Sequence, residues 1–493
     1  MKKISDNLVI IYSSLIGFLL TFVWTLLNFI STPNNCSLFA KFDLINYKFA
    51  AFFYITSLIA FTIAGYFGYK QLVNNEQVSF RYGATIPAVF LFLAFLLVPL
   101  NGHDLNFYFS AGRAVAGGQN VYTSNWPVGN LLQCGPSAEF SQGIMYGPIT
   151  VTVLTIFYKF SLGSILWFLF YWKLLMILLF VLTAWLVYKI ISEVTSLDKF
   201  KFNLLFLSQP LIVWAWIGSG QFDALWLVFV LAAILLSIGR QWAMVIVALT
   251  FGIWIKFIPV LMTPWFVLWW WQDTNKANWK NNMLQAFAGV VSSLLLTVLV
   301  WQNYWQGFKV FNTIILQSKW AVSSIFAVSY YSLKGLFVMA FAEQAHFVLT
   351  RLLQGSLLLF AVYLLWPMVS RVYSLILRRE IWVATDFILG IFISMLIYLG
   401  IWQKSFWPWY ISWLVPFGVI LFYTYPSDYL KKILIWISLA PVIFYMLWIV
   451  NHQLASTDAT SELWFQWAVV LSVWVYPVIN LIKWRRINFS IDK

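Results

Sequence analysis

Residues 283–301 read MLQAFAGVVSSLLLTVLVW and contain no Lys, Arg, Asp or Glu. A helix that crosses the hydrocarbon core of a bilayer needs about 20 predominantly apolar residues, and this stretch has that length. Other long windows without these charged residues occur along the chain, at 7–40, 49–69, 202–222 and 405–427. The pattern predicts an all-α, polytopic transmembrane protein.

The composition leads to the same class. The 493 residues are 62% hydrophobic and 9% charged, whereas a soluble domain has about 45–50% apolar and about 25% charged residues. These values exclude a soluble enzyme, a DNA-binding protein and a secreted disulfide scaffold. The formal net charge is +14, but the basic residues lie in short connections between apolar windows, as the positive-inside rule describes. We therefore expect no nucleic-acid partner.

The hydropathy pattern predicts a bundle of about 14 spans. They cover residues 8–30, 49–69, 83–100, 164–191, 203–218, 222–238, 241–255, 258–271, 283–301, 347–370, 383–402, 408–424, 432–450 and 463–483. The distribution of Lys and Arg places both termini in the cytoplasm. On this topology a first long loop, 101–163, and a second, 301–346, face the outer side. Neither a GxxxxGK[ST] nor a GxGxxG motif occurs, so we expect no nucleotide cofactor.

The first outer loop carries an ordered set of motifs. Asp104 follows the third span and begins the pattern D-x-x-x-Y-x-x-A, and a G-x-x-x-Y pattern then ends at Tyr122. After an insert at 124–144, Tyr146-Gly147-Pro148 opens the apolar segment 147–160. We expect that segment to be a helix lying at the outer interface and capped by Tyr146.

Three further segments follow in order. Gln221-Phe222-Asp223 lies in a short outer turn, and Lys256 separates two short apolar half-spans. Near the C-terminus, residues 408–416 read PWYISWLVP. Together with the first outer loop, this order resembles the GT-C glycosyltransferases that use polyprenyl-phosphate sugars. It looks most like the bacterial polyprenol-phosphate-mannose-dependent branch and the catalytic subunit of GPI mannosyltransferase I.

The resemblance implies a fold and an activity. It implies a GT-C-like catalytic module at 83–300, two additional N-terminal spans at 1–82, the second outer loop at 301–346 and a C-terminal transmembrane module at 347–493. The activity would be transfer of a hexose, with mannose favoured, from a polyprenyl-phosphate sugar to a lipid or glycan acceptor. The chain departs from the family pattern because two spans precede the motif loop and the insert 124–144 is long.

Asp104 is the candidate general base, because a positioned carboxylate can accept the proton of an acceptor hydroxyl. A direct displacement with one base would invert the anomeric configuration. On a helix covering 105–117, Arg113 is expected to face roughly the same side as Asp104 and to contact phosphate, with a structural ion pair as the alternative. Tyr122 and Tyr146 belong to the same motifs and are candidate donor- or acceptor-binding residues.

The other candidates are charged or aromatic residues near span ends. Asp223, with Gln221, is a second carboxylate or orienting partner, or a helix cap. Lys256 could hold the lipid phosphate, or its side chain could extend to the interface as many membrane lysines do. Further phosphate or sugar contacts are expected from the residues His346, Arg351, Lys404, Trp409 and Tyr410.

Metal ions and disulfides receive weaker support. The outer loops contain no DxD pair, so we expect metal-independent chemistry. Cys36 and Cys134 both face outward on this topology and could form a disulfide. The family branch favours a bacterial plasma membrane with an outward-facing active site, and an endoplasmic reticulum membrane with a luminal site would show the same charge pattern. A transporter or lipid flippase, and a glycan ligase with a lipid-linked substrate, remain alternatives; the long outer loop speaks against the transporter.

Overall fold

The computed structural model describes most of the chain from residue 102 onward. The described residues are 102–128, 139–141, 143–196, 212–274, 279–312, 324–341, 344–378, 381–403, 407–425, 427–449 and 463–490, with scattered positions before 102 and at 202, 206 and 209. Almost all of the expected module 1–82 lies outside the described residues. The same holds for Cys36, Cys134 and Lys404.

The chain divides into two compact units. The first unit comprises Met1–Val260 with Asn278–Leu316, and the second comprises Leu261–Ala277 with Gln317–Lys493. Each unit has its own packed helices and is described by itself.

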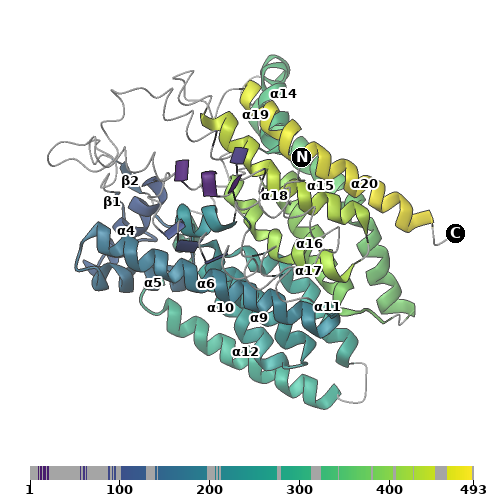
Figure 1. Cartoon of the computed structure of the whole chain (residues 1–493), viewed down its shortest axis with the longest axis horizontal. Helices are drawn as coiled ribbons and strands as arrows, with labels where there is room; N and C mark the ends of the chain where they lie inside the picture. The colour runs from purple at the N-terminus through teal and green to yellow at the C-terminus, as the bar shows by residue number, and fades with distance from the viewer. Residues whose placement is uncertain are drawn as a thin grey trace, which may run out of the picture. The chain divides into compact units, whose positions relative to one another are not determined.

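Four helices form the body of the first unit (Figure 1). They are α6 (Ile165–Val194), α9 (Asp223–Ile238), α10 (Trp242–Ile255) and α12 (Trp279–Trp301). Helix α9 packs against both α6 and α10, and α12 packs against α10. Because α9 is apolar and largely buried, it is the core of this unit, as expected for a helix surrounded by others.

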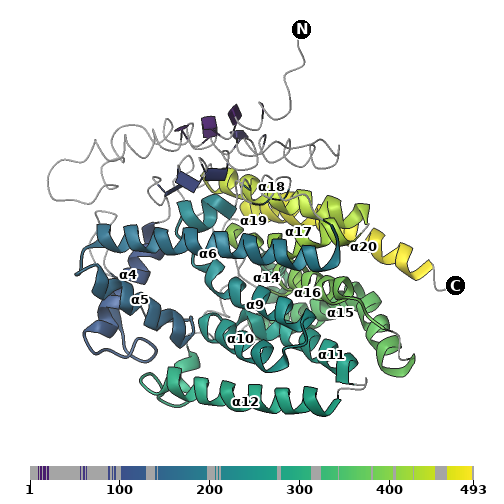
Figure 2. The same cartoon turned by 60° about the horizontal axis from the view of Figure 1, so that its bottom comes forward.

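Two shorter helices and a small hairpin precede α6. Helix α4 (Gly102–Ala116) packs against α5 (Pro148–Phe160), and the two lie side by side in Figure 2. In the sequence between α4 and α5, β1 (Trp126–Val128) pairs antiparallel with β2 (Glu139–Ser141), with Trp126 opposite Ser141. The insert expected at 124–144 therefore includes a two-stranded hairpin.

The start of α5 differs from the sequence expectation. Its N-cap is Gly147 rather than Tyr146, and Pro148 follows as the first helical residue. A proline is favoured there because its missing N–H has no partner within the helix. A glycine is required because a Cβ at 147 would lie 2.0 Å from the carbonyl oxygen of Trp254. The close approach of α5 to the end of α10 therefore fixes this boundary.

The second unit is also helical. Its elements are α11 (Thr263–Thr274), α14 (Ile325–Phe341), α15 (Ala345–Tyr373), the π-helix η6 (Ser374–Arg378), α16 (Ala384–Ile397), the π-helix η7 (Tyr398–Trp402), the 3-10 helix η8 (Pro408–Trp413), α17 (Val415–Thr424), α18 (Asp428–Ile449), α19 (Leu463–Val469), the π-helix η11 (Val470–Trp474) and α20 (Val475–Ser490). The Gln272 side chain on α11 donates from Nε2 to the Trp382 carbonyl at 2.9 Å, and its Oε1 accepts from the Trp382 amide at 2.8 Å. Arg371 and Asp386 form an ion pair that joins α15 to α16.

One expected loop contains a helix instead. The segment 301–346 was expected to be a long outer loop, but it includes α14, an apolar helix that packs against α15. Phe326 and Ala327 of α14 form a buried cluster with Leu349 and Leu353 of α15. The two helices therefore make an antiparallel pair.

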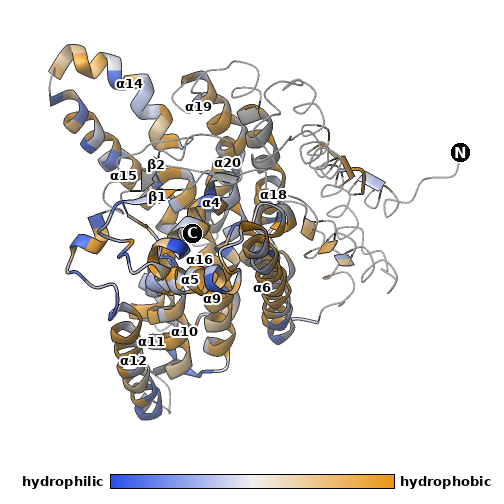
Figure 3. Cartoon of the chain, turned by 90° about the vertical axis from the view of Figure 1, so that its left-hand side faces the viewer, coloured by the Kyte–Doolittle hydropathy of each residue, from blue (hydrophilic) through white to orange (hydrophobic). Residues whose placement is uncertain are grey.

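The helices have the length and character expected of a membrane protein. Among the described residues, five are long and apolar enough to cross a bilayer: Ile165–Val194, Trp279–Trp301, Ala345–Trp366, Ala384–Ile401 and Leu463–Arg485. Hydrophobic residues cover most of α6 and α12 (Figure 3). The all-α polytopic fold class is thus confirmed, while the number of 14 spans stays a prediction. The break at Lys256 is also observed, because α10 ends at Ile255 and a 3-10 helix, η3 (Ile258–Met262), follows.

Candidate functional site

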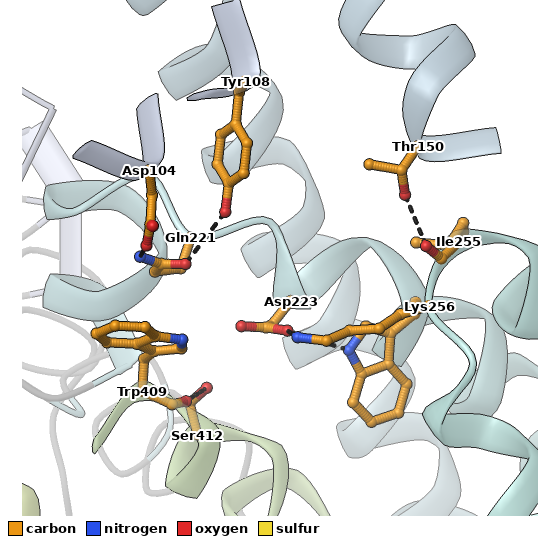
Figure 4. Close-up of polar contacts among 10 residues, drawn as sticks. Asp104, Tyr108, Thr150, Gln221, Asp223, Ile255, Lys256, Trp409 and Ser412 are labelled. Atoms are coloured by element: carbon orange, nitrogen blue, oxygen red, sulfur yellow. Dashed lines mark hydrogen bonds and ion pairs between the residues drawn. The ribbon is translucent and has the colours of Figure 1, made fainter. Parts of the chain in front are cut away.

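Asp104 and Gln221 meet in the first unit although they are far apart in sequence. Asp104 lies in the first turn of α4, where the helix dipole favours an anion. The Gln221 side chain Nε2 donates a hydrogen bond of 2.6 Å to Asp104 Oδ2 (Figure 4). Asp104 is partly exposed, whereas Gln221 is buried. A buried amide therefore holds one oxygen of a partly exposed carboxylate.

Tyr108 completes this set of contacts. It lies one turn after Asp104 on α4, and residues at i and i+4 share a helix face. The Tyr108 hydroxyl donates to Gln221 Oε1 at 3.3 Å. Burial raises the pKa of Tyr108 well above its usual value, and the nearby Tyr146 and Asp104 add to the shift. The phenol is therefore protonated at neutral pH and acts as a donor.

A second pair lies next to the first. Lys256 Nζ is 2.5 Å from Asp223 Oδ1, and the side chains are 11% and 1% exposed. Trp226 Nε1 also donates to the same carboxylate oxygen, at 3.4 Å. Asp223 opens α9 and Lys256 caps the end of α10, so the ion pair joins two helix termini. Such a buried charge pair is costly to break on one side.

The end of α10 is held in place by the start of α5. The hydroxyl of Thr150 donates to the carbonyl of Ile255 at 2.8 Å (Figure 4), and the Gly147 amide donates to the same oxygen at 3.0 Å. Lys256 follows directly. The Y-G-P motif therefore positions the cation of the second pair through the backbone of α10.

Aromatic rings pack around the two pairs. The rings of Tyr146 and Phe222 pack edge to face with centroids 4.5 Å apart, and Phe222 also contacts the Tyr108 ring at 5.4 Å. The ammonium of Lys256 lies 5.4 Å from the Phe222 centroid. Burial, with the charges of Asp104 and Asp223, raises the pKa of Tyr146. The carboxylates thus lie in a largely aromatic surrounding.

Comparison with known proteins gives one match. Residues 31–272 match the family model described as alpha-(1->6)-mannopyranosyltransferase, N-terminal domain. This match covers just under half of the chain and makes the protein similar to that mannosyltransferase family. The protein is a membrane glycosyltransferase of the GT-C type, as the sequence motifs indicated. A search of curated proteins and a search of solved structures each found no match.

The matched segment contains the whole cluster. Asp104, Tyr108, Gln221, Asp223 and Lys256 all fall within residues 31–272. The family domain of this mannosyltransferase therefore supplies two carboxylates, an amide, a phenol and a cation within one unit of the fold.

Two predicted residues from the segment 101–163 do not join the cluster as expected. Nine residues separate Asp104 from Arg113, which is two and a half turns of α4, so they lie on opposite faces rather than the same one. Tyr122 is buried and its hydroxyl donates to the Tyr146 carbonyl at 2.8 Å. In this mannosyltransferase Tyr122 therefore links the end of the α4 segment to the start of α5.

The remaining predicted residues lie in the second unit. His346 and Arg351 are both exposed on α15, where His346 bonds the Tyr330 hydroxyl at 2.7 Å and Arg351 lies over the Phe347 ring. They have separate partners. Trp409 and Tyr410 lie in η8, and Ser412 donates to the Trp409 carbonyl at 2.5 Å (Figure 4).

Sequence reasoning did not single out Tyr108, Thr150, Phe222 or Trp226 as site residues. Tyr108 had a usable signal, because the D-x-x-x-Y spacing places it on the same helix face as Asp104. Thr150 had none, since its bond to the Ile255 carbonyl depends on how α5 meets α10. Within the described parts of the chain, no three or more His, Cys, Asp or Glu side chains are grouped so that they could hold a metal ion.

Proposed function

We propose that the protein transfers mannose from a polyprenyl-phosphate mannose donor to a hydroxyl of a lipid or glycan acceptor, with Asp104 as general base. The observation that carries this proposal is the Gln221–Asp104 hydrogen bond. It fixes a partly exposed carboxylate at a helix N-terminus, within the residues that match the mannosyltransferase family. A base must be held in this way to act on one defined hydroxyl.

The proposed step is a single displacement. The acceptor oxygen forms a bond to the anomeric carbon of mannose while the bond from that carbon to the phosphate oxygen breaks. Asp104 takes the hydroxyl proton, and polyprenyl phosphate leaves with the bonding electrons. The configuration at the anomeric carbon is inverted. General base catalysis of this kind contributes about 10²–10⁴-fold.

Lys256 is proposed to stabilise the charge that develops on the leaving phosphate. Its ammonium lies 2.5 Å from Asp223, and Asp223 would hold it in position. Because this cation belongs to the chain, the proposal requires no divalent metal ion. We further propose that the protein is in a bacterial plasma membrane, that both termini are cytoplasmic and that the site faces outward.

A donor comparison tests the proposal. Purified protein in detergent is given radiolabelled polyprenyl-phosphate mannose, polyprenyl-phosphate glucose or a nucleoside-diphosphate mannose, each with a panel of lipid and oligomannose acceptors. We expect mannose transfer and release of polyprenyl phosphate from the first donor. In the Asp104→Asn variant we expect the rate to fall at least about 100-fold.

Asp428→Asn is the matched control. Asp428 also lies in the first turn of a helix, α18, but it is exposed and belongs to the second unit. This variant should retain the wild-type rate. Transfer from the nucleoside-diphosphate sugar would refute the donor class, and an active Asp104→Asn enzyme would refute the base.

A further inference from the structure

Several backbone contacts fix the loop before α9, which carries the buried residue Gln221. Gly220 has a positive φ of 73°, and its carbonyl accepts a 2.8 Å hydrogen bond from Trp172 Nε1. The Gln221 amide N–H donates to the Ala215 carbonyl at 3.1 Å. A Cβ on Gly220 would lie 3.1 Å from Leu105, the neighbour of Asp104. The backbone of this loop is therefore fixed against α4.

The side chain of Gln221 has a defined orientation. Its amide carries two donor hydrogens on nitrogen and an acceptor oxygen, so its two ends need different partners. A carboxylate only accepts hydrogen bonds, so Nε2 faces Asp104 Oδ2, and Oε1 accepts from the Tyr108 hydroxyl. If the amide were flipped, its oxygen would face the carboxylate and its nitrogen would face the phenol hydroxyl.

We infer that Gln221 and Tyr108 are positioning residues for the proposed base. The phenol holds the amide oxygen in place, and the amide nitrogen holds one oxygen of the Asp104 carboxylate. This inference rests on the proposed function, because it assumes that Asp104 accepts the proton. The inference adds that the orientation of the Asp104 carboxylate depends on Gln221, which is 117 positions away in the sequence.

The charges around this chain of hydrogen bonds are those of the site itself. The ionisable groups that act on Tyr108 and Tyr146 include Asp104 and Asp223, and Asp223 is paired with Lys256. His103 precedes Asp104 in the sequence. A new negative charge at position 221 would therefore act first on Asp104, the carboxylate at hydrogen-bond distance.

The test is a double-mutant cycle on the full-length protein with polyprenyl-phosphate mannose as donor. The variants are Tyr108→Phe, Gln221→Leu and the double variant, with Asp104→Asn assayed in parallel. We expect Gln221→Leu to lower kcat about 10–100-fold, the range seen when a residue that orients another group is removed, with KM changed much less. Tyr108→Phe should lower kcat less in the wild type and have no further effect in the Gln221→Leu background.

Gln221→Glu gives a second, isosteric readout. Glu at 221 would place a carboxylate against Asp104, and like charges disfavour ionisation. We expect the acid limb of the pH–rate profile to move up by about one pH unit or more. Activity should then recover toward alkaline pH, which a purely structural defect would not produce. Thermal unfolding of each variant in detergent reports whether it is folded.

The outcomes separate the two proposals. If Asp104→Asn keeps its activity, the assigned base is wrong and the positioning role is wrong with it. If Asp104→Asn is inactive but Gln221→Leu and Gln221→Glu keep wild-type kcat and pH dependence, only the positioning role is wrong. Equal losses from Tyr108→Phe in both backgrounds would show that Tyr108 does not act through Gln221.

Discussion

Lys256 and Asp223 form a buried ion pair, 2.5 Å between Nζ and Oδ1, at the point where the end of α10 meets the start of α9. The pair joins two helices that pack along their length. It also places a cation beside the carboxylates of the proposed site.

Removing one partner of this pair should destabilise the protein strongly. Loss of one charge leaves the other buried without its counter-ion, at a cost of about 3–5 kcal/mol. We expect Lys256→Met to be worse than Asp223→Asn, because the Asp223 side chain is 1% exposed and that of Lys256 is 11% exposed. Midpoints of thermal unfolding in detergent measure the effect. The double variant should lose less stability than Lys256→Met; a larger, additive loss would contradict the ion-pair account.

A methyl group at position 147 should disrupt the junction of α5 and α10. The φ of Gly147 is −69°, which alanine also adopts, so Gly147→Ala tests space rather than backbone strain. Its Cβ would lie 2.0 Å from the Trp254 carbonyl oxygen. We expect a loss of roughly 1–3 kcal/mol or more from overpacking.

Gly355→Ala is the control for this effect. Gly355 lies within α15, and a Cβ there meets nothing within 4 Å. Alanine in a helix interior is favoured over glycine by about 0.5–1 kcal/mol. The control should therefore unfold at the same temperature as the wild type or slightly above it. An equal loss in both variants would exclude steric contact at 147 as the cause.

The buried tyrosines of residues 101–163 should make the protein sensitive to alkali. Burial raises the pKa values of Tyr108, Tyr122 and Tyr146. An acid with a raised pKa in the folded state is neutral in both states below its unfolded pKa of about 10, so its contribution is complete there. Above that pH the unfolded chain releases protons first, and stability falls as pH rises.

Tyrosinate absorbance measured alongside unfolding checks this expectation. The three phenols should ionise together with the unfolding transition rather than before it. Tyr122→Phe removes one of them and the hydrogen bond to the Tyr146 carbonyl, which is worth about 0.5–1.5 kcal/mol. The variant should be less stable at neutral pH and lose less stability between neutral and alkaline pH. Ionisation of all three phenols in the folded protein would contradict the prediction.

Chelation should leave mannosyl transfer unchanged. In the proposal the charge on the leaving phosphate is stabilised by Lys256, and the base Asp104 is held by Gln221. We expect the same rate of polyprenyl phosphate release after treatment with EDTA and after addition of Mg²⁺ or Mn²⁺. A rate that collapses with EDTA and returns with either ion would show that a metal is required.

Local patterns in the sequence predicted the helices well. The expected span 283–301 corresponds to α12, and 347–370 corresponds to α15. The predicted break at Lys256 separates α10 from α11. Hydropathy succeeds here because the membrane imposes its length and apolarity on each segment separately.

Other features could not be predicted in this way. Helix α14 lies in a stretch that its overall polarity indicates to be a loop, yet the apolar residues of α14 pack on α15. The start of α5 at Gly147 depends on the carbonyl of Trp254. Both are determined by a neighbouring helix, which a single-segment pattern does not report.

The sequence by itself determined the membrane class, the mannosyltransferase motifs and the identity of Asp104 as a candidate base. Tertiary structure decided its partners: Gln221 reaches Asp104 across 117 residues, and Lys256 reaches Asp223 across 33. The physical reason is that hydropathy and helix spacing describe the environment of residues within a single segment. Hydrogen bonds and ion pairs between helix ends exist only where packing brings those ends together.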